Sequence, residues 1–109
     1  MKIALNKSLN LDGKEIDEIE LKLEDLTGED ILKVDTELRV NGSAYGFNNV
    51  YDQKVLLSVA SKASGIIVDD LKKLSAPDFL EVTFSVRNFL MGLSGQKEES
   101  KSSEESSSN

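Results

Sequence analysis

The chain contains no cysteine and no histidine. Without cysteine it has no disulfide, no thiolate nucleophile and none of the usual zinc sites. Without histidine it lacks the side chain that enzymes use most often for acid–base chemistry near neutral pH. Carboxylate, lysine and hydroxyl chemistry remain, but no constellation of such residues supports an active site. We therefore expect a protein that is not an enzyme, with no catalytic residues, no metal site and no cofactor.

Long apolar runs are also missing from the sequence. No stretch approaches the roughly 20 residues that a transmembrane helix needs. The N-terminal stretch MKIALNKSLNLDG never reaches the apolar segment of about seven residues that a secretory signal requires. We expect no association with a membrane and a location in the cytoplasm.

Basic residues are outnumbered, with 13 lysines and arginines against 20 aspartates and glutamates, so the formal net charge is −7. An acidic balance of this size disfavours nucleic acid or an anionic membrane as a partner. The acidic residues of the N-terminal half lack the spacing of a calcium loop, and alternation along a strand sends them to solvent. A solvated face is therefore favoured over a metal cluster or a paired-carboxylate site. The residues concerned are Glu15, Asp17, Glu18, Glu20, Glu24, Asp25, Glu29 and Asp30.

The composition changes abruptly near the end of the 109-residue chain. Residues 95–109 have no apolar side chain and are dominated by serine and glutamate, so they cannot offset their ordering entropy by burial. Residues 1–94 are enough for one modest core but not for two. We predict a single domain over residues 1–94 and a disordered tail over residues 95–109.

The first part of the domain reads as a β-hairpin. Ile3 and Leu5 alternate with polar or small residues, and Leu9 and Leu11 continue the same phase. Asp12-Gly13 is a strong signal for a tight turn. Residues 18–24 then alternate with period two, which predicts a second strand with Ile19, Leu21 and Leu23 on one face. Such a ribbon is barely stable alone and must lie on something.

Three helices are expected between the hairpin and the C-terminal part of the domain. Thr27 followed by Asp30 predicts a capped start, and Asn41-Gly42 predicts the end of that helix. A second helix is expected over about residues 50–64, with Gly65 at its stop. Asp69 or Asp70 is predicted to cap a short helix of one to two turns. The residues expected to face inward are Ile31, Val34 and Leu38, then Val55, Leu56, Val59, Ala60 and Ala63, then Leu71 and Leu74.

A last helix is predicted over residues 75–93, with Ser75 at its start and Pro77 in its first turn. It is apolar over more than half of its circumference, so it is either central to the domain or shared with a partner. The fold expected is therefore α+β, an N-terminal β-hairpin followed by three to four helices packed around the C-terminal helix. One apolar stripe comprises Phe79, Val82, Val86, Phe89, Leu90 and Leu93, and the polar side comprises Asp78, Glu81, Ser85 and Asn88.

A second stripe on the last helix is formed by Leu80, Phe84 and Met91, with Arg87 beside it. Either the preceding helices cover this stripe, or it is an exposed apolar surface of the kind that marks a partner site. The glycine-rich loop at residues 41–49 lacks the ending of a phosphate-binding loop. Its Tyr45 and Phe47 are most simply satellite core residues, with contact to a partner as the alternative because aromatic residues are enriched at interfaces.

The order of elements, together with particular residues, resembles the tail assembly chaperones of long-tailed bacteriophages, in the small α+β branch of that group. The resemblance covers about residues 2–93. It is carried by the strand Ile3–Leu5, the turn Asp12-Gly13-Lys14 leading to Ile16 and Ile19–Leu23, the helix start Gly28-Glu29-Asp30-Ile31, the helix end Ala60–Gly65, the run Asp69-Asp70-Leu71-Lys72-Lys73-Leu74, and Asp78 with the last helix through Phe89-Leu90.

The resemblance implies a non-enzymatic protein that binds the tape-measure protein and keeps it soluble until tail-tube subunits polymerise around it. It further implies a longer, frameshifted form that recruits the major tail-tube protein, and a protein that acts in the host cell cytoplasm and is absent from the mature virion. The residues themselves suggest Leu80, Phe84, Arg87 and Met91 as the client-binding surface.

Two other classes remain open. One is a small acidic interaction or inhibitor module that mimics nucleic acid, and the other is a structural subunit of the virion. The edge of the hairpin also offers a route to self-association by strand addition, although its lysines and glutamates guard against it.

Overall fold

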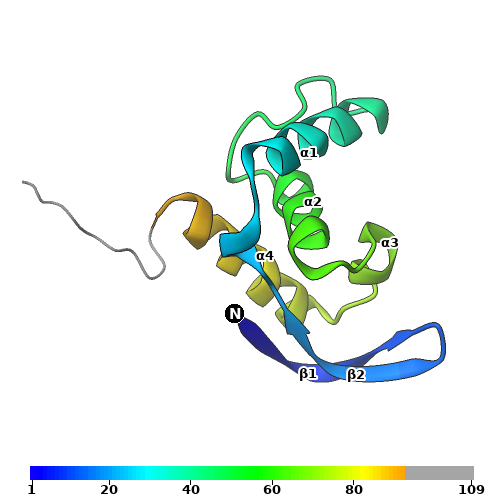
Figure 1. Cartoon of the computed structure of the whole chain (residues 1–109). Helices are drawn as coiled ribbons and strands as arrows, with labels where there is room; N and C mark the ends of the chain where they lie inside the picture. The colour runs from blue at the N-terminus through cyan, green and yellow to red at the C-terminus, as the bar shows by residue number, and fades with distance from the viewer. Residues whose placement is uncertain (93–109) are drawn as a thin grey trace, which may run out of the picture.

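The computed structural model describes residues 1–92 and shows an α+β fold, an antiparallel hairpin followed by helices, as predicted (Figure 1). The predicted disordered tail, the domain boundary at residue 94 and Leu93 lie outside the described residues. The elements are β1 (Lys2–Leu11), β2 (Lys14–Glu20), the 3₁₀ helix η1 (Leu23–Asp25), α1 (Gly28–Val40), α2 (Gln53–Ser64), α3 (Val68–Leu71) and α4 (Ala76–Leu90).

The hairpin turns at Asp12-Gly13, as the sequence predicted. Both residues have positive φ angles, 51° and 86°, which a two-residue turn matched to the twist of the strands requires. The second strand is shorter than predicted, because β2 ends at Glu20 rather than continuing to Glu24. The backbone N–H of Lys22 instead donates to the carbonyl of Ala63 at 3.0 Å, so the chain leaves β1 and joins the end of α2. Leu21 and Leu23 are nevertheless buried, Leu23 in the 3₁₀ helix.

β1 contains an irregularity in its middle. Ala4 pairs with Glu18 and Leu9 pairs with Ile16, so residues 5–8 of β1 lie opposite the single residue Asp17. A bulge of this kind bends the strand and removes backbone groups from the ladder. The N–H groups of residues 6 and 7 are therefore free to find partners outside the sheet.

α1 begins and ends where the sequence predicted. The hydroxyl of Thr27 accepts the backbone N–H of Asp30, and the carboxylate of Asp30 accepts the backbone N–H of Thr27, which completes a capping box. Val34 and Leu38 are buried, and Asn41 follows as the C-cap.

α2 starts at Gln53, three residues later than predicted, because the carboxylate of Asp52 caps it by accepting the backbone N–H of Lys54 at 2.8 Å. All five residues predicted to face inward are buried, and Leu57 is buried as well. Gly65 ends the helix with a φ of 78°, as predicted. In the short α3, Asp69 and Asp70 lie in the first turn, and the cap position that they were expected to fill belongs to Ile67.

The helix at the centre of the domain is α2, not the C-terminal helix as the sequence predicted. α2 packs against α1, α3, α4, β2 and the 3₁₀ helix, whereas α4 packs mainly against α2 and β1. Figure 1 shows α1 above α2 and the hairpin below α4. One side of α4 is thus left without a neighbouring helix. The core is formed by Ile3, Leu9, Ile19, Leu21, Leu23, Val34, Leu38, Val55, Leu56, Leu57, Val59, Ala60, Ala63, Leu71, Leu74, Val82 and Val86.

Asp78 departs from the prediction most clearly. The helical wheel placed it on the polar side of the last helix, but the residue is only 1 % exposed. The reason is the bulge in β1, which lies against the first turn of α4 and turns its backbone toward this carboxylate.

Candidate partner-binding surfaces

The carboxylate of Asp78 joins α4 to the hairpin. Oδ1 accepts the backbone N–H of Asn6 at 2.9 Å and its side-chain amide at 3.1 Å, while Oδ2 accepts the backbone N–H of Lys7 at 3.1 Å. The Ser75 hydroxyl donates to Oδ2 at 2.9 Å, so the predicted cap residue binds this side chain instead of the helix backbone. One carboxylate therefore satisfies both amides that the bulge releases.

These donors also set the charge state of Asp78. The backbone N–H of Asn6 has the largest effect, and it holds the pKa of the carboxyl below its usual value although burial acts in the opposite direction. The backbone N–H of Lys7 and the Ser75 hydroxyl lower the pKa further. Asp78 is thus an ionised, buried anchor that fixes which side of α4 faces the rest of the domain.

The opposite side of α4 carries the second stripe predicted from the sequence. Leu80 is 40 % exposed, Phe84 38 % and Met91 40 %, so the helices do not cover these side chains. Leu80 and Phe84 are one turn apart on the helix, and Met91 lies two turns beyond Phe84. We name Leu80, Phe84, Met91 and the adjacent Arg87 the α4 surface.

Arg87 contributes to this surface through Phe84. Its guanidinium carbon lies 4.6 Å from the centre of the Phe84 ring, within the range of a cation–π contact. The contact holds the ring against the helix and leaves a half-buried positive charge at the edge of an apolar patch. The structure therefore brings together all four residues that the sequence placed here.

Tyr45 and Phe47, the other two predicted contact residues, lie in the loop between α1 and α2. Phe47 is half-buried against the core, as a satellite core residue should be, but Tyr45 is 78 % exposed. The expectation that both belong to the core is therefore wrong for Tyr45. The hollow beside Tyr45, about 220 Å³ in volume, is lined by loop and α2 residues and by none from α4.

A clamp from α1 holds this loop in place. The Asp35 carboxylate accepts the backbone N–H of Phe47 at 2.8 Å and the Nε–H of Arg39 at 3.0 Å, and these two donors, in that order, lower its pKa. The Arg39 guanidinium also donates to the carbonyls of Ala44 and Tyr45. Gly46 has a φ of 57°, and a Cβ there would collide with Asp35 and Arg39. Tyr45 is thus presented outward on a fixed loop.

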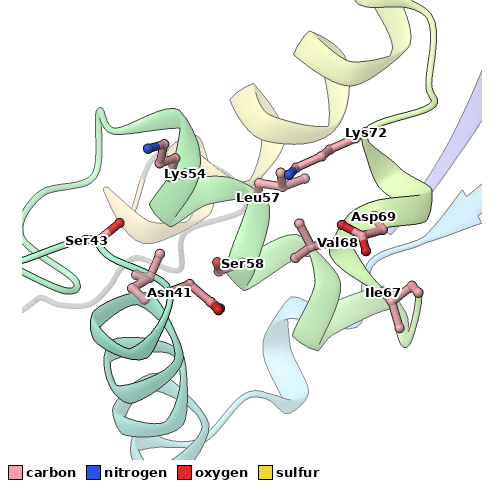
Figure 2. A pocket seen from close by; sticks show the side chains of 10 residues that line it. Asn41, Ser43, Lys54, Leu57, Ser58, Ile67, Val68, Asp69 and Lys72 are labelled. Atoms are coloured by element: carbon pink, nitrogen blue, oxygen red, sulfur yellow. The ribbon is translucent and has the colours of Figure 1, made fainter.

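A groove that the sequence did not reveal runs between α1, α2 and α3 (Figure 2). Its volume is about 570 Å³, and Leu38, Leu57 and Val68 supply much of its apolar lining. Lys54 and Lys72 lie on its rim and Asp69 is its acidic residue (Figure 2). We name this feature the α2 groove. The signal that could have indicated it is the run Ile66-Ile67-Val68, three apolar residues in a link too short to bury all of them.

Two classes of site have no support within residues 1–92. No group of three or more potential ligands that could hold a metal ion occurs there. Over the same residues, none of the helices is long and apolar enough to cross a membrane.

Comparison with known proteins gives no further guide to the site. No protein-family model, curated protein or solved structure matches the chain. The function of the protein is therefore inferred from its residues and their arrangement.

Proposed function

We propose that this protein is a tail assembly chaperone of a long-tailed bacteriophage, which binds the tape-measure protein and keeps it soluble until tail-tube subunits polymerise around it. The observation that carries the proposal is the α4 surface. A helix whose inner side is locked to the body presents Leu80, Phe84 and Met91 to solvent in one row. An apolar row of this kind in a small domain is typical of a partner site.

The α4 surface suits a helical client. An amphipathic helix docks through apolar residues at i, i+3, i+4 and i+7. These residues form a stripe that can pack along the apolar row of α4. Arg87 is of a residue type that often dominates binding energy at interfaces, and Phe84 is of a type enriched there. A tape-measure protein offers long amphipathic helices, so many copies of the chaperone bind along one client and gain avidity from weak single contacts.

The charge of the protein fits the same role. Residues 1–92 carry a net charge of −5 and the remaining 17 residues −2, since they hold two lysines and four glutamates. A bound coat of acidic domains would keep an apolar client in solution. Under this proposal the protein acts in the host cytoplasm, a longer frameshifted form recruits the major tail-tube protein, and neither form stays in the mature virion.

The test is co-expression with the product of the next long reading frame downstream, followed by size exclusion. We expect that product to be insoluble alone and to elute with this protein as a large complex of many copies. The Phe84→Glu variant should lose the complex, because a carboxylate in the middle of the α4 surface must be desolvated on binding. Elution of this protein alone, beside a precipitated client, would contradict the proposal.

The matched control is Leu32→Glu. Leu32 is a similarly apolar, 68 % exposed helical residue on α1, away from the α4 surface, and the variant adds the same charge. It should retain the client complex. Two further measurements separate the other classes: competition against DNA identifies a nucleic-acid mimic, and retention in purified virions identifies a structural subunit.

A further inference from the structure

We propose that the α2 groove is a second binding site, which takes an amphipathic helix that carries carboxylates along one edge. The site is distinct from the α4 surface, since no α4 residue lines it, and Figure 2 shows α4 passing behind α2. Its volume of about 570 Å³ is that of a binding cleft, and it is partly open to solvent.

The lining of the groove is apolar where a partner side chain would insert. Leu38 and Leu57 are buried in the domain but reach its surface here, and Val68 is half-buried beside them. At the edge stands Ile67, which is 61 % exposed although it is one of the more apolar side chains. Covering these groups would remove apolar area from water without any rearrangement of the helices.

The charge of the groove is opposite to that of the domain. Lys54 of α2 and Lys72 at the end of α3 line it, against the single carboxylate of Asp69. Neither lysine forms an ion pair with any residue from 1 to 92. The groove therefore carries +1 in a domain of net charge −5, so the rest of that domain carries −6. A partner with carboxylates is attracted to this place and repelled elsewhere, which fixes its position.

The walls of the groove determine the conformation of the partner. They are formed by α1, α2 and α3 together with the residues that flank these helices, and no strand lines the groove. An extended peptide could therefore not add to a sheet edge there, and the part of its backbone that the groove covers would lose water without gaining a strand as hydrogen-bond partner. A helix satisfies its backbone internally and brings only side chains. The expected partner helix therefore places leucine or phenylalanine side chains in the groove and glutamates toward Lys54 and Lys72.

The tail of this chain lacks the composition expected of the occupant. It is acidic, but residues 94–109 contain no apolar side chain to fill the space against Leu57 and Val68. The occupant is therefore a segment of another protein. The neighbouring hollow at Tyr45 shares Ser43 and Lys54 with the groove, so a helix longer than the groove would run on toward the exposed tyrosine.

The test is a titration of the full ¹⁵N-labelled chain with two synthetic peptides, followed by amide chemical shifts. Both peptides are amphipathic helices of about 14 residues, roughly four turns, with the same leucine face; one has flanking glutamates and the other has flanking lysines. We expect the glutamate peptide to shift the amides of Leu57, Ile67 and Val68, and the lysine peptide to bind at least about tenfold more weakly. Equal binding of the two peptides, or shifts confined to the α4 surface, would overturn the proposal.

Two pairs of variants make the result specific. The double variant Lys54→Glu with Lys72→Glu should bind the glutamate peptide about tenfold or more weakly than the wild type. The double variant Lys14→Glu with Lys22→Glu makes the same charge change outside the groove and should keep the wild-type affinity. Ile67→Ser should weaken binding without harming the fold, since serine is favoured at the N-cap position that Ile67 occupies. Leu32→Ser is its control. Unchanged affinity in the Lys54/Lys72 or Ile67 variants would show that the peptide binds elsewhere.

Discussion

The two sides of α4 are both apolar, yet their surroundings differ. Val82 and Val86 are buried against the body, with Asp78 fixed to the hairpin in the first turn. Leu80 and Phe84, on the same helix, are exposed to solvent. The difference shows that apolar side chains alone do not determine which side of a helix is covered. A polar anchor decides it, because the bulge in β1 has backbone donors that only Asp78 satisfies.

The largest expected effect is the loss of that anchor. In Asp78→Asn one acceptor oxygen becomes an amide NH₂ group that faces backbone N–H donors, so those donors lose their partner. We expect the unfolding temperature to fall further than it does when a buried valine of α4 is truncated, and the amides of Asn6 and Lys7 to lose protection from hydrogen exchange. Protection that survives in this variant would show that the anchor is not what holds the bulge.

The same residue has a predicted pH dependence. Its pKa is lower in the folded state than in the unfolded chain, so its stabilisation is complete well above the ordinary aspartate pKa of about 3.9 and is lost as the pH falls through the lowered value. Asp30, Asp35 and Glu15 have pKa values shifted in the same direction and contribute as well. The free energy of unfolding should therefore fall less steeply with acid in Asp78→Asn than in the wild type, in a series of urea titrations from about pH 7 to about pH 3.

A moderate effect is expected when a buried side chain on the inner side of α4 is truncated. Val86→Ala removes two buried methyl groups and should lower the free energy of unfolding by about 2 kcal/mol, or the unfolding temperature by about 10 °C. Calorimetry measures both. A change within error would mean that Val86 is not tightly packed.

The outer side should tolerate a much larger chemical change. Phe84→Glu should cost less than about 1 kcal/mol of unfolding free energy, since glutamate has a good helix propensity and gains Arg87 as an i+3 partner. Urea titration gives the value. A loss comparable to that of Val86→Ala would place Phe84 in the core.

The smallest effect is expected for Arg87→Gln. It removes the cation–π contact over Phe84, which at an exposed site is worth about 0.5–1 kcal/mol. The measurable results are a change in the ring resonances of Phe84 and a fall in the unfolding temperature of about 5 °C or less.

Much of the fold could be predicted because its signals are local. The Asp12-Gly13 turn, the Thr27–Asp30 capping box and the Gly65 stop each depend on a few neighbouring residues, and all three are where the sequence placed them. The inward side of α2 was also predictable, since its apolar spacing is regular.

The features that escaped prediction depend on contacts between distant residues. Asp78 is 72 positions from Asn6, and no sequence pattern near either residue predicts a bulge in β1. The α2 groove likewise arises from three helices. The apolar pattern of α4 predicted two stripes, but which of them is covered depends on the contact between Asp78 and the distant bulge in β1.

The most direct test of the α4 surface is a double comparison of client binding by Val86→Ala and Phe84→Glu, each co-expressed with the product of the next long reading frame. The quantity measured is the amount of that product recovered per copy of this protein after size exclusion, at a temperature where both variants remain folded. We predict that Val86→Ala, the less stable variant, recovers the client at the wild-type ratio and that Phe84→Glu recovers almost none. Loss of the client in proportion to stability, whichever side of α4 is changed, would contradict the assignment of the outer side as the binding surface.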